Sequence, residues 1–124
     1  DEGVAFLVLP EGKTIYHAGD LNDWYWKEES EDWNQEMSAK FRKYIEPLRD
    51  RKIDAAFIPL DPRQEEYYTL GMDYFLELAK PEKVYPMHFW RKPEIIERWL
   101  EEHPQSQDRD RIVRITEEGE MFEQ

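Results

Sequence analysis

The sequence contains no cysteine, and only three of its 124 residues are histidines: His17, His88 and His103. Without cysteine the chain has no disulfide framework, no thiolate metal site and no cysteine nucleophile. A bound metal ion would therefore need histidine, aspartate or glutamate ligands. The absence of disulfides favours a cytoplasmic location, which is the compartment that we expect.

Basic residues are scarce as well. The chain has 17 lysines and arginines against 29 aspartates and glutamates, and its formal net charge is −12. Proteins that hold nucleic acid or anionic membranes neutralise phosphates with rows of basic side chains, and no such row occurs here. No apolar run approaches the length of a membrane span. We therefore expect neither nucleic acid nor a membrane as a partner.

The length suits one domain spanning residues 1–124. Periodicity and turn residues predict strands at 4–9, 13–16, 53–59 and 83–87, helices at about 34–46, 62–79 and 93–103, and a last hairpin formed by 112–116 and 120–122. Strands that alternate with helices predict an α/β fold. We expect a mixed sheet with about three helices packed on it.

Several local signals support these elements. The continuous apolar run of residues 4–9 is typical of a strand buried on both faces. Asn34 is the expected N-cap of the first helix, and Asp61 followed by proline is the expected N-cap of the second. Residues 21–33 show no periodicity but many aromatic side chains, which predicts a loop that packs over the core or beside a binding site.

Polar residues stand where two of the predicted strands end. The segment His17-Ala18-Gly19-Asp20 follows one strand, and His88 follows another. An aspartate and a histidine brought together by a sheet suit a divalent metal ion, and a glycine permits the tight turn that would present the aspartate. The same residues also suit structural roles, Asp20 as a turn residue and His88 as a hydrogen-bonded histidine.

A complete metal site is not evident from these residues. Catalytic zinc takes three protein ligands, and the third histidine, His103, lies at a predicted helix end among glutamates. That position favours a solvated, helix-capping role.

The order and the amino-acid sequences of three segments resemble those of the metallo-β-lactamase-fold hydrolases, in particular their small bacterial branch similar to the L-ascorbate-6-phosphate lactonases. These segments are "GVAFLVLPEGKTIYHAGDLN", "IDAAFIPLDPR" and "YYTLGMDYFLELAKPEKVYPMHFW". The resemblance covers nearly the whole chain. It implies that Asp20 bridges two metal ions and that His88 binds one of them. The ions would be divalent, with zinc expected and manganese or iron possible, and would activate water against a small-molecule substrate.

The chain departs from the family at its principal metal motif. No His-x-His-x-Asp-His sequence is present, and in the family this motif precedes the segments matched here. We therefore expect the C-terminal half of an αββα sandwich, cut just before "GVAFLV". Such a half would be inactive alone. It would need the missing N-terminal half, or a second copy in a homodimer, to cover its sheet.

A second interpretation belongs to a different class. The chain would then be a non-catalytic acidic α/β interaction module that binds another chain through its aromatic loop and open sheet. A third interpretation is a self-contained α/β domain in which Asp20 and His88 are structural.

Overall fold

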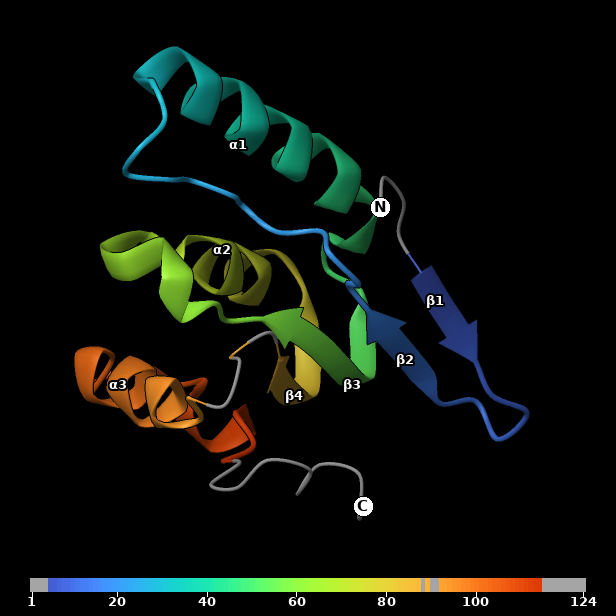
Figure 1. Ribbon diagram of the computed structural model, residues 1–124. Helices are drawn as coiled ribbons and strands as arrows, with labels where there is room; N and C mark the ends of the chain where they lie inside the picture. The colour runs from blue at the N-terminus through green and yellow to red at the C-terminus, as the bar shows by residue number, and fades with distance from the viewer. Residues whose placement is uncertain (1–4, 88, 90–91, 115–124) are drawn as a thin grey trace.

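Strands and helices alternate along the described part of the chain, which comprises residues 5–87, 89 and 92–114 of a computed structural model (Figure 1). The strands are β1 Ala5–Val8, β2 Thr14–His17, β3 Lys52–Pro59 and β4 Lys80–Met87. The α-helices are α1 Glu31–Ile45, α2 Leu70–Leu78 and α3 Glu94–Glu102. Short 3₁₀ helices are η1 Glu46–Leu48, η2 Pro62–Tyr67 and η3 Arg109–Arg111. The expected α/β class is confirmed.

The strands form one sheet in the order β1-β2-β3-β4. β1 pairs antiparallel with β2, whereas β2, β3 and β4 run parallel, so the sheet is mixed as expected. The predicted hairpin joins β1 to β2. Its turn is closed by hydrogen bonds between Leu9 and Lys13 and between Gly12 and Leu9, and Gly12 has the positive φ of 88° that glycine tolerates.

One face of the sheet is buried beneath the helices. Tyr16, Ala56 and Val84 share one register across β2, β3 and β4, and each is fully buried. The Phe75 ring of α2 stacks on Tyr16 with the ring centroids 6.0 Å apart. Figure 1 shows α2 between α1 and α3. The hydrophobic core therefore lies between this sheet face and the three helices.

The opposite face of the parallel strands is only partly covered. We call it the open face, and its residues, each half-buried or exposed, are Ile15, His17, Ala55, Phe57, Lys83 and Tyr85. The ring centroids of His17 and Phe57 are 5.5 Å apart, and those of Phe57 and Tyr85 are 4.9 Å apart. None of the six is acidic, although the chain carries a net charge of −12.

The first strand is not buried on both faces. Val8 is 62 % exposed, which contradicts that part of the prediction. β1 pairs only with β2 among the described residues and stands at the end of the strand order, so one of its sides meets no neighbouring strand there. An apolar run alone does not distinguish a central strand from such an edge strand.

The first helix begins earlier than predicted. α1 starts at Glu31, and its N-cap is Ser30, whose Oγ accepts a hydrogen bond from the Trp33 backbone N–H at 3.1 Å. The prediction of Asn34 as N-cap is wrong, since Asn34 lies inside the helix and is buried. Serine caps a helix as well as asparagine, and acidic residues in the first turn favour this start. The helix ends just before Pro47, as proline predicts.

The second predicted helix is divided in two. η2 and α2 replace a continuous helix over 62–79, and Glu65 inside η2 has a φ of 53° and a ψ of −125°. The predicted cap is confirmed, because the Asp61 carboxylate accepts a hydrogen bond from the Arg63 backbone N–H at 2.9 Å. The break accompanies the burial of Gln64, whose side chain contacts the loop after β2.

The last predicted elements also differ from the structure. β4 starts at Lys80 and not at Lys83, because Lys80 and Pro81 pair with the start of β3. Ile112 forms a single parallel bridge to Val84, and η3 lies between α3 and this bridge. The rest of the predicted hairpin, residues 115–124, lies outside the described residues. No helix in the described ranges is long and apolar enough to cross a membrane.

Candidate functional site

The three parallel strands end at the same edge of the sheet. His17 at the end of β2 pairs with Phe57, and Pro59 at the end of β3 pairs with Met87 at the end of β4. Backbone hydrogen bonds extend the pairing past the strands, from Ala18 to Phe57 at 3.0 Å and from Leu60 to Met87 at 2.8 Å. This edge is where α/β sheets commonly carry their ligands.

Asp20 stands at this edge, directly after a tight turn. Gly19 has a φ of 61°, a left-handed conformation that suits glycine, and its N–H donates to Nδ1 of His17 at 3.0 Å. Asp20 itself is exposed. The turn thus presents the aspartate to solvent at the strand end, as its sequence indicated.

The second predicted ligand, His88, lies outside the described residues. In the sequence it follows Met87, the last residue of β4, directly. Among the residues that the structure describes, no group of three or more histidine, aspartate or glutamate side chains is placed to hold a metal ion. The assignment of Asp20 and His88 as a ligand pair stays a prediction.

A second aspartate, Asp61, follows β3 at the same edge. It is fully buried and binds the guanidinium of Arg63, with Nη2 2.7 Å from Oδ2. The hydrogen bond to Asp61 raises the pKa of Arg63 above its ordinary value. Because Asp61 also caps η2, its carboxylate serves the local fold at this strand end.

Gln64 clamps the loop that carries Asp20. Its side-chain oxygen accepts a hydrogen bond from Asn22 Nδ2 at 2.9 Å, and its Nε2 donates to the carbonyls of Asp23 at 2.8 Å and Tyr25 at 3.3 Å. Gln64 is only 1 % exposed. Such a buried amide, satisfied on both sides, fixes the course of the loop. No sequence pattern marked this residue.

Two residues of α1 hold the same loop from the other side. Asn34 accepts a hydrogen bond from the Trp26 N–H at 2.9 Å and donates to the Trp26 carbonyl at 2.8 Å. Ser38 Oγ donates to the Asp23 carboxylate at 2.5 Å. Burial raises the pKa of Asp23, while the Ser38 hydrogen bond and the charge of Arg42 oppose the rise. Asn34, the predicted N-cap of the helix, instead secures the loop.

The aromatic residues of the loop pack on one another. Trp24 and Trp26 stack with ring centroids 5.5 Å apart, and Trp24 Nε1 donates to the Asp20 carbonyl at 2.7 Å. Tyr25 packs against Tyr67 of η2 at 4.5 Å. The expectation that this loop packs down is confirmed, because all three loop aromatics are half-buried.

A cavity of about 270 Å³ lies between this loop and α1. The loop contributes Asp20, Leu21, Asn22 and Trp24, and the helix contributes Met37, Lys40, Phe41 and Tyr44. The helical residues are spaced i, i+3, i+4 and i+7, so they lie on one face of α1. Asp20 therefore adjoins a cavity with both charged and apolar walls.

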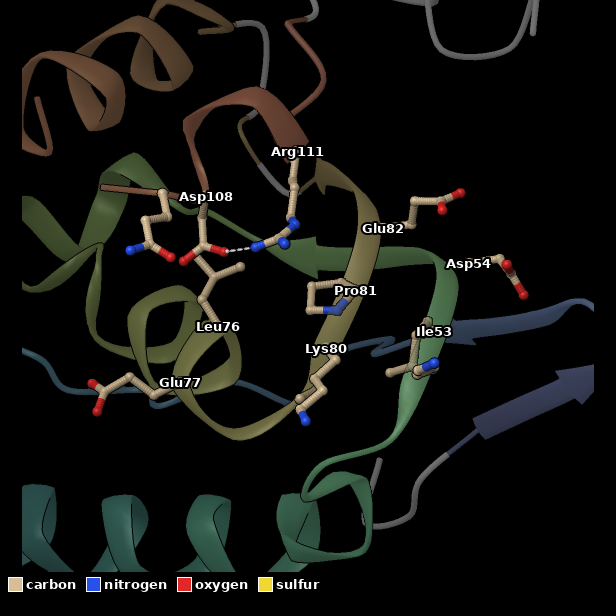
Figure 2. A pocket seen from close by; sticks show the side chains of 12 residues that line it. Ile53, Asp54, Leu76, Glu77, Lys80, Pro81, Glu82, Asp108 and Arg111 are labelled. Carbon is tan, nitrogen blue, oxygen red and sulfur yellow. Dashed lines mark hydrogen bonds and ion pairs between the residues drawn. The ribbon is translucent and has the colours of Figure 1, made fainter. Parts of the chain in front are cut away.

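A wider hollow of about 650 Å³ lies at the other end of the strands (Figure 2). It is lined by the first residues of β3 and β4, including Ile53 and Lys80, and by Leu76 of α2. Figure 2 shows the ion pair of Asp108 and Arg111 at its rim, joined at 2.7 Å. The hollow lies at the opposite end of the strands from Asp20, and its lining carries charges of both signs. We therefore do not assign the predicted metal binding to it.

His103 belongs to a separate cluster that joins α2 to α3. Its Nδ1 lies 2.7 Å from the Trp99 carbonyl oxygen and its Nε2 lies 3.1 Å from Asp73 Oδ2. Trp99 Nε1 donates to the other oxygen of Asp73 at 3.0 Å. His103 is the C-cap residue of α3, as expected, but it is half-buried and not fully solvated. Both ring nitrogens are engaged, so His103 serves helix packing.

Comparison with protein-family models, with curated proteins and with solved structures finds no match to this chain.

Proposed function

We propose that this chain forms one side of the active site of a metal-dependent hydrolase, as the C-terminal half of a metallo-β-lactamase-like αββα sandwich. The observation that carries the proposal is the common edge at which β2 and β4 end, on either side of β3. Asp20 follows β2 at that edge, and His88 follows β4 in the sequence. These two residues are the proposed ligands of a divalent ion, zinc first, with manganese and iron as alternatives.

The described residues do not by themselves fit a complete metal site. Catalytic zinc takes three protein ligands, and no group of three suitable side chains is present in the described ranges. The resemblance implies that the other ligands belong to a His-x-His-x-Asp-His segment, which this sequence lacks. We therefore derive no step of hydrolysis from this chain and expect it to be inactive by itself toward a small-molecule substrate.

Zinc titration of the chain in a calorimeter tests the proposed ligand pair. We expect weak binding, with a dissociation constant on the order of 0.1 mM, because two ligands leave the coordination shell half filled. Asp20→Asn and His88→Gln should each weaken this binding about tenfold or more, which corresponds to about 1.4 kcal/mol.

Asp32→Asn is the matched control, since Asp32 is an exposed aspartate in the first turn of α1, away from the strand ends. It should leave zinc binding unchanged. Tight binding of two ions by the chain alone would contradict the expected half site. Equal binding by the wild type and Asp20→Asn would contradict the ligand assignment.

The open face favours a second candidate function, that of an interaction module. It carries three adjoining rings, those of His17, Phe57 and Tyr85, and no acidic residue. Partly exposed aromatic surface of this kind is typical of protein contact sites. In this interpretation the chain binds a second copy of itself, or another chain, and Asp20 is a turn residue.

The two candidate functions differ in the property that a substitution should change. The hydrolase proposal requires zinc binding to depend on Asp20. The module proposal requires self-association to depend on the open face, and sedimentation velocity measures this directly.

A further inference from the structure

The contact between α2 and α3 centres on an imidazole ring with an oxygen beside each nitrogen. His103 Nδ1 lies 2.7 Å from the Trp99 carbonyl oxygen, and His103 Nε2 lies 3.1 Å from Asp73 Oδ2. A carbonyl and an ionised carboxylate only accept hydrogen bonds, so both ring nitrogens have to donate. A neutral imidazole carries one N–H and would present a lone pair to one of these oxygens. An imidazolium donates to both.

The additional proton belongs to the imidazole and not to Asp73. Histidine is a stronger base than aspartate, so a proton shared between the two side chains resides on the ring. Asp73 Oδ1 accepts a hydrogen bond from Trp99 Nε1 at 3.0 Å, so both oxygens of Asp73 serve as acceptors, as they do in a carboxylate. The two side chains therefore form an ion pair between α3 and α2.

The face of the His103 ring meets an aromatic ring. The ring centroids of His103 and Trp99 are 3.9 Å apart, and the two planes are inclined by 12°. The face of an indole carries the negative part of its quadrupole and attracts a cation. Trp99 is 1 % exposed and is tied to Asp73, so its indole is held in this orientation. The imidazolium gains a cation–π attraction that a neutral ring would not have.

The position at a helix end acts in the same direction. His103 is the C-cap residue of α3, and its backbone N–H donates to the Leu100 carbonyl at 3.3 Å. The C-terminal end of a helix is the negative end of its dipole and favours a cation. Two hydrogen bonds, an aromatic ring and a helix end therefore all favour the charged form of His103.

Acidic groups face His103 from three segments. Asp73 and Glu77 of α2 and Asp108 of the segment before η3 line, together with His103, a cavity of about 250 Å³. Glu102 precedes His103 at the end of α3. These carboxylates add to the attraction for a cation at this position.

Basic groups reach the same helix end. Arg109 Nη1 donates to the Leu100 carbonyl and, at 3.5 Å, to the His103 carbonyl. Two further arginines are bound to acidic side chains, Arg98 to Glu102 and Arg111 to Asp108. Their charges are thus largely balanced by their partners, and Asp73 and Glu77 stand against Arg109 alone among the described groups named here.

We propose that His103 is a pH-sensitive latch between α2 and α3. The imidazolium holds the end of α3 against Asp73, and loss of its proton removes one hydrogen bond and the cation–π attraction. Because the native state favours the protonated ring, this stabilisation is present at low pH and is lost as the pH rises. The side chains of His103 and Asp73 are 23 % and 35 % exposed, so the latch exchanges protons with solvent. It involves neither Asp20 nor His88 and does not depend on the proposed hydrolase activity.

The nitrogen NMR spectrum of the His103 ring, recorded at about pH 7, tests the protonation state directly. We expect both ring nitrogens to show the chemical shifts of protonated nitrogen. In Asp73→Asn the new amide can donate to Nε2, so a neutral ring satisfies both contacts, and we expect Nε2 to lose its proton. The wild-type spectrum needs no substitution and stays decisive even if a variant does not fold.

Hydrogen exchange of the α3 amides tests the consequence for the helix. Wild-type protection, divided by protection in His103→Gln, should fall about tenfold between about pH 6 and about pH 9. The division cancels titrations that both proteins share. His17→Gln, which removes the exposed histidine at the end of β2, is the matched control and should keep the wild-type pH dependence.

The proposal is overturned if the wild-type ring is neutral at about pH 7, or if Asp73→Asn leaves the His103 spectrum unchanged. It is also overturned if the protection ratio is constant across the pH range, because His103 would then hold the helices equally well with and without its proton. Failure of zinc binding bears on none of these outcomes.

Discussion

Single residues decide how closely α2 approaches the loop after β2. Gly71 lies where an added Cβ would stand 1.9 Å from Asn22 Oδ1 and 3.2 Å from the Asp23 nitrogen. No side chain fits in that space. Gly71 is therefore required for a close contact, and not for an unusual φ.

We predict that Gly71→Ala destabilises the protein although alanine favours helices. Helix propensity alone would add about 1 kcal/mol of stability, whereas forcing an atom into this contact costs about 1–3 kcal/mol. The expected net loss, measured by urea unfolding, is about 1–2 kcal/mol. Asn22→Ala removes the nearest atoms, so the double variant should lose less than the sum of the single variants. Additive losses would contradict the contact.

The buried carboxyl group of Asp23 should make stability depend on pH. Burial raises its pKa above the ordinary value of 3.8. A group whose pKa is raised on folding contributes stability that is fully present below the unfolded pKa and is lost as the pH rises through the folded pKa. Wild-type protein should therefore lose stability relative to Asp23→Asn between about pH 4 and pH 7.

Urea unfolding of both proteins across this range measures the effect. Asp32→Asn, which changes an exposed aspartate, serves as the control and should track the wild type. A difference between the wild type and Asp23→Asn that does not vary with pH would show that Asp23 carries no raised pKa.

At the scale of elements, local sequence patterns predicted most helices and strands, but they did not predict where the second helix is interrupted or where the first begins. Buried strands and amphipathic helices have periodicities that a sequence displays directly. The kink at Glu65 inside η2 has no such signal, because it accompanies the burial of Gln64 against a loop that lies about 40 residues earlier in the chain. Asn34 misled the prediction for the same reason, since its partner is Trp26 and not a helix terminus.

Gln64→Leu should loosen the loop that carries Asp20. The substitution keeps the size of the side chain but leaves Asn22 Nδ2 and the Asp23 carbonyl without their partner. We expect a loss of about 2–4 kcal/mol and faster hydrogen exchange in residues 18–26. Gln35→Leu on the exposed face of α1 is the control and should cost no more than about 0.5 kcal/mol. Equal effects of the two substitutions would contradict the role of Gln64 in holding this loop.

At the scale of the whole molecule, the three helices gather on one face of the sheet and leave the other partly exposed. That arrangement links the two candidate functions, because a half sandwich and an interaction module both need the open face to be covered. The net charge of −12 opposes contact between copies, whereas the open face itself carries no acidic residue.

We predict weak self-association through the open face. Sedimentation velocity should show a dimer with a dissociation constant on the order of 10–100 µM, and added salt should strengthen it because repulsion between the acidic copies is screened. Phe57→Glu should restore the monomer. Trp33→Ser removes a large exposed side chain from α1 and should have no effect. A monomer under all these conditions would argue against the open face as a contact between copies.

The sequence by itself determined the α/β class, the hairpin of β1 and β2, the cap at Asp61 and the turn that presents Asp20. Each depends on residues close together in the chain, whose preferences act locally. Only the tertiary structure decided that β2, β3 and β4 end at one edge, that Gln64 and Asn34 hold the loop after β2, and that Lys40 stands across a cavity from Asp20. These relations join segments distant in sequence, and packing and buried hydrogen bonds select them.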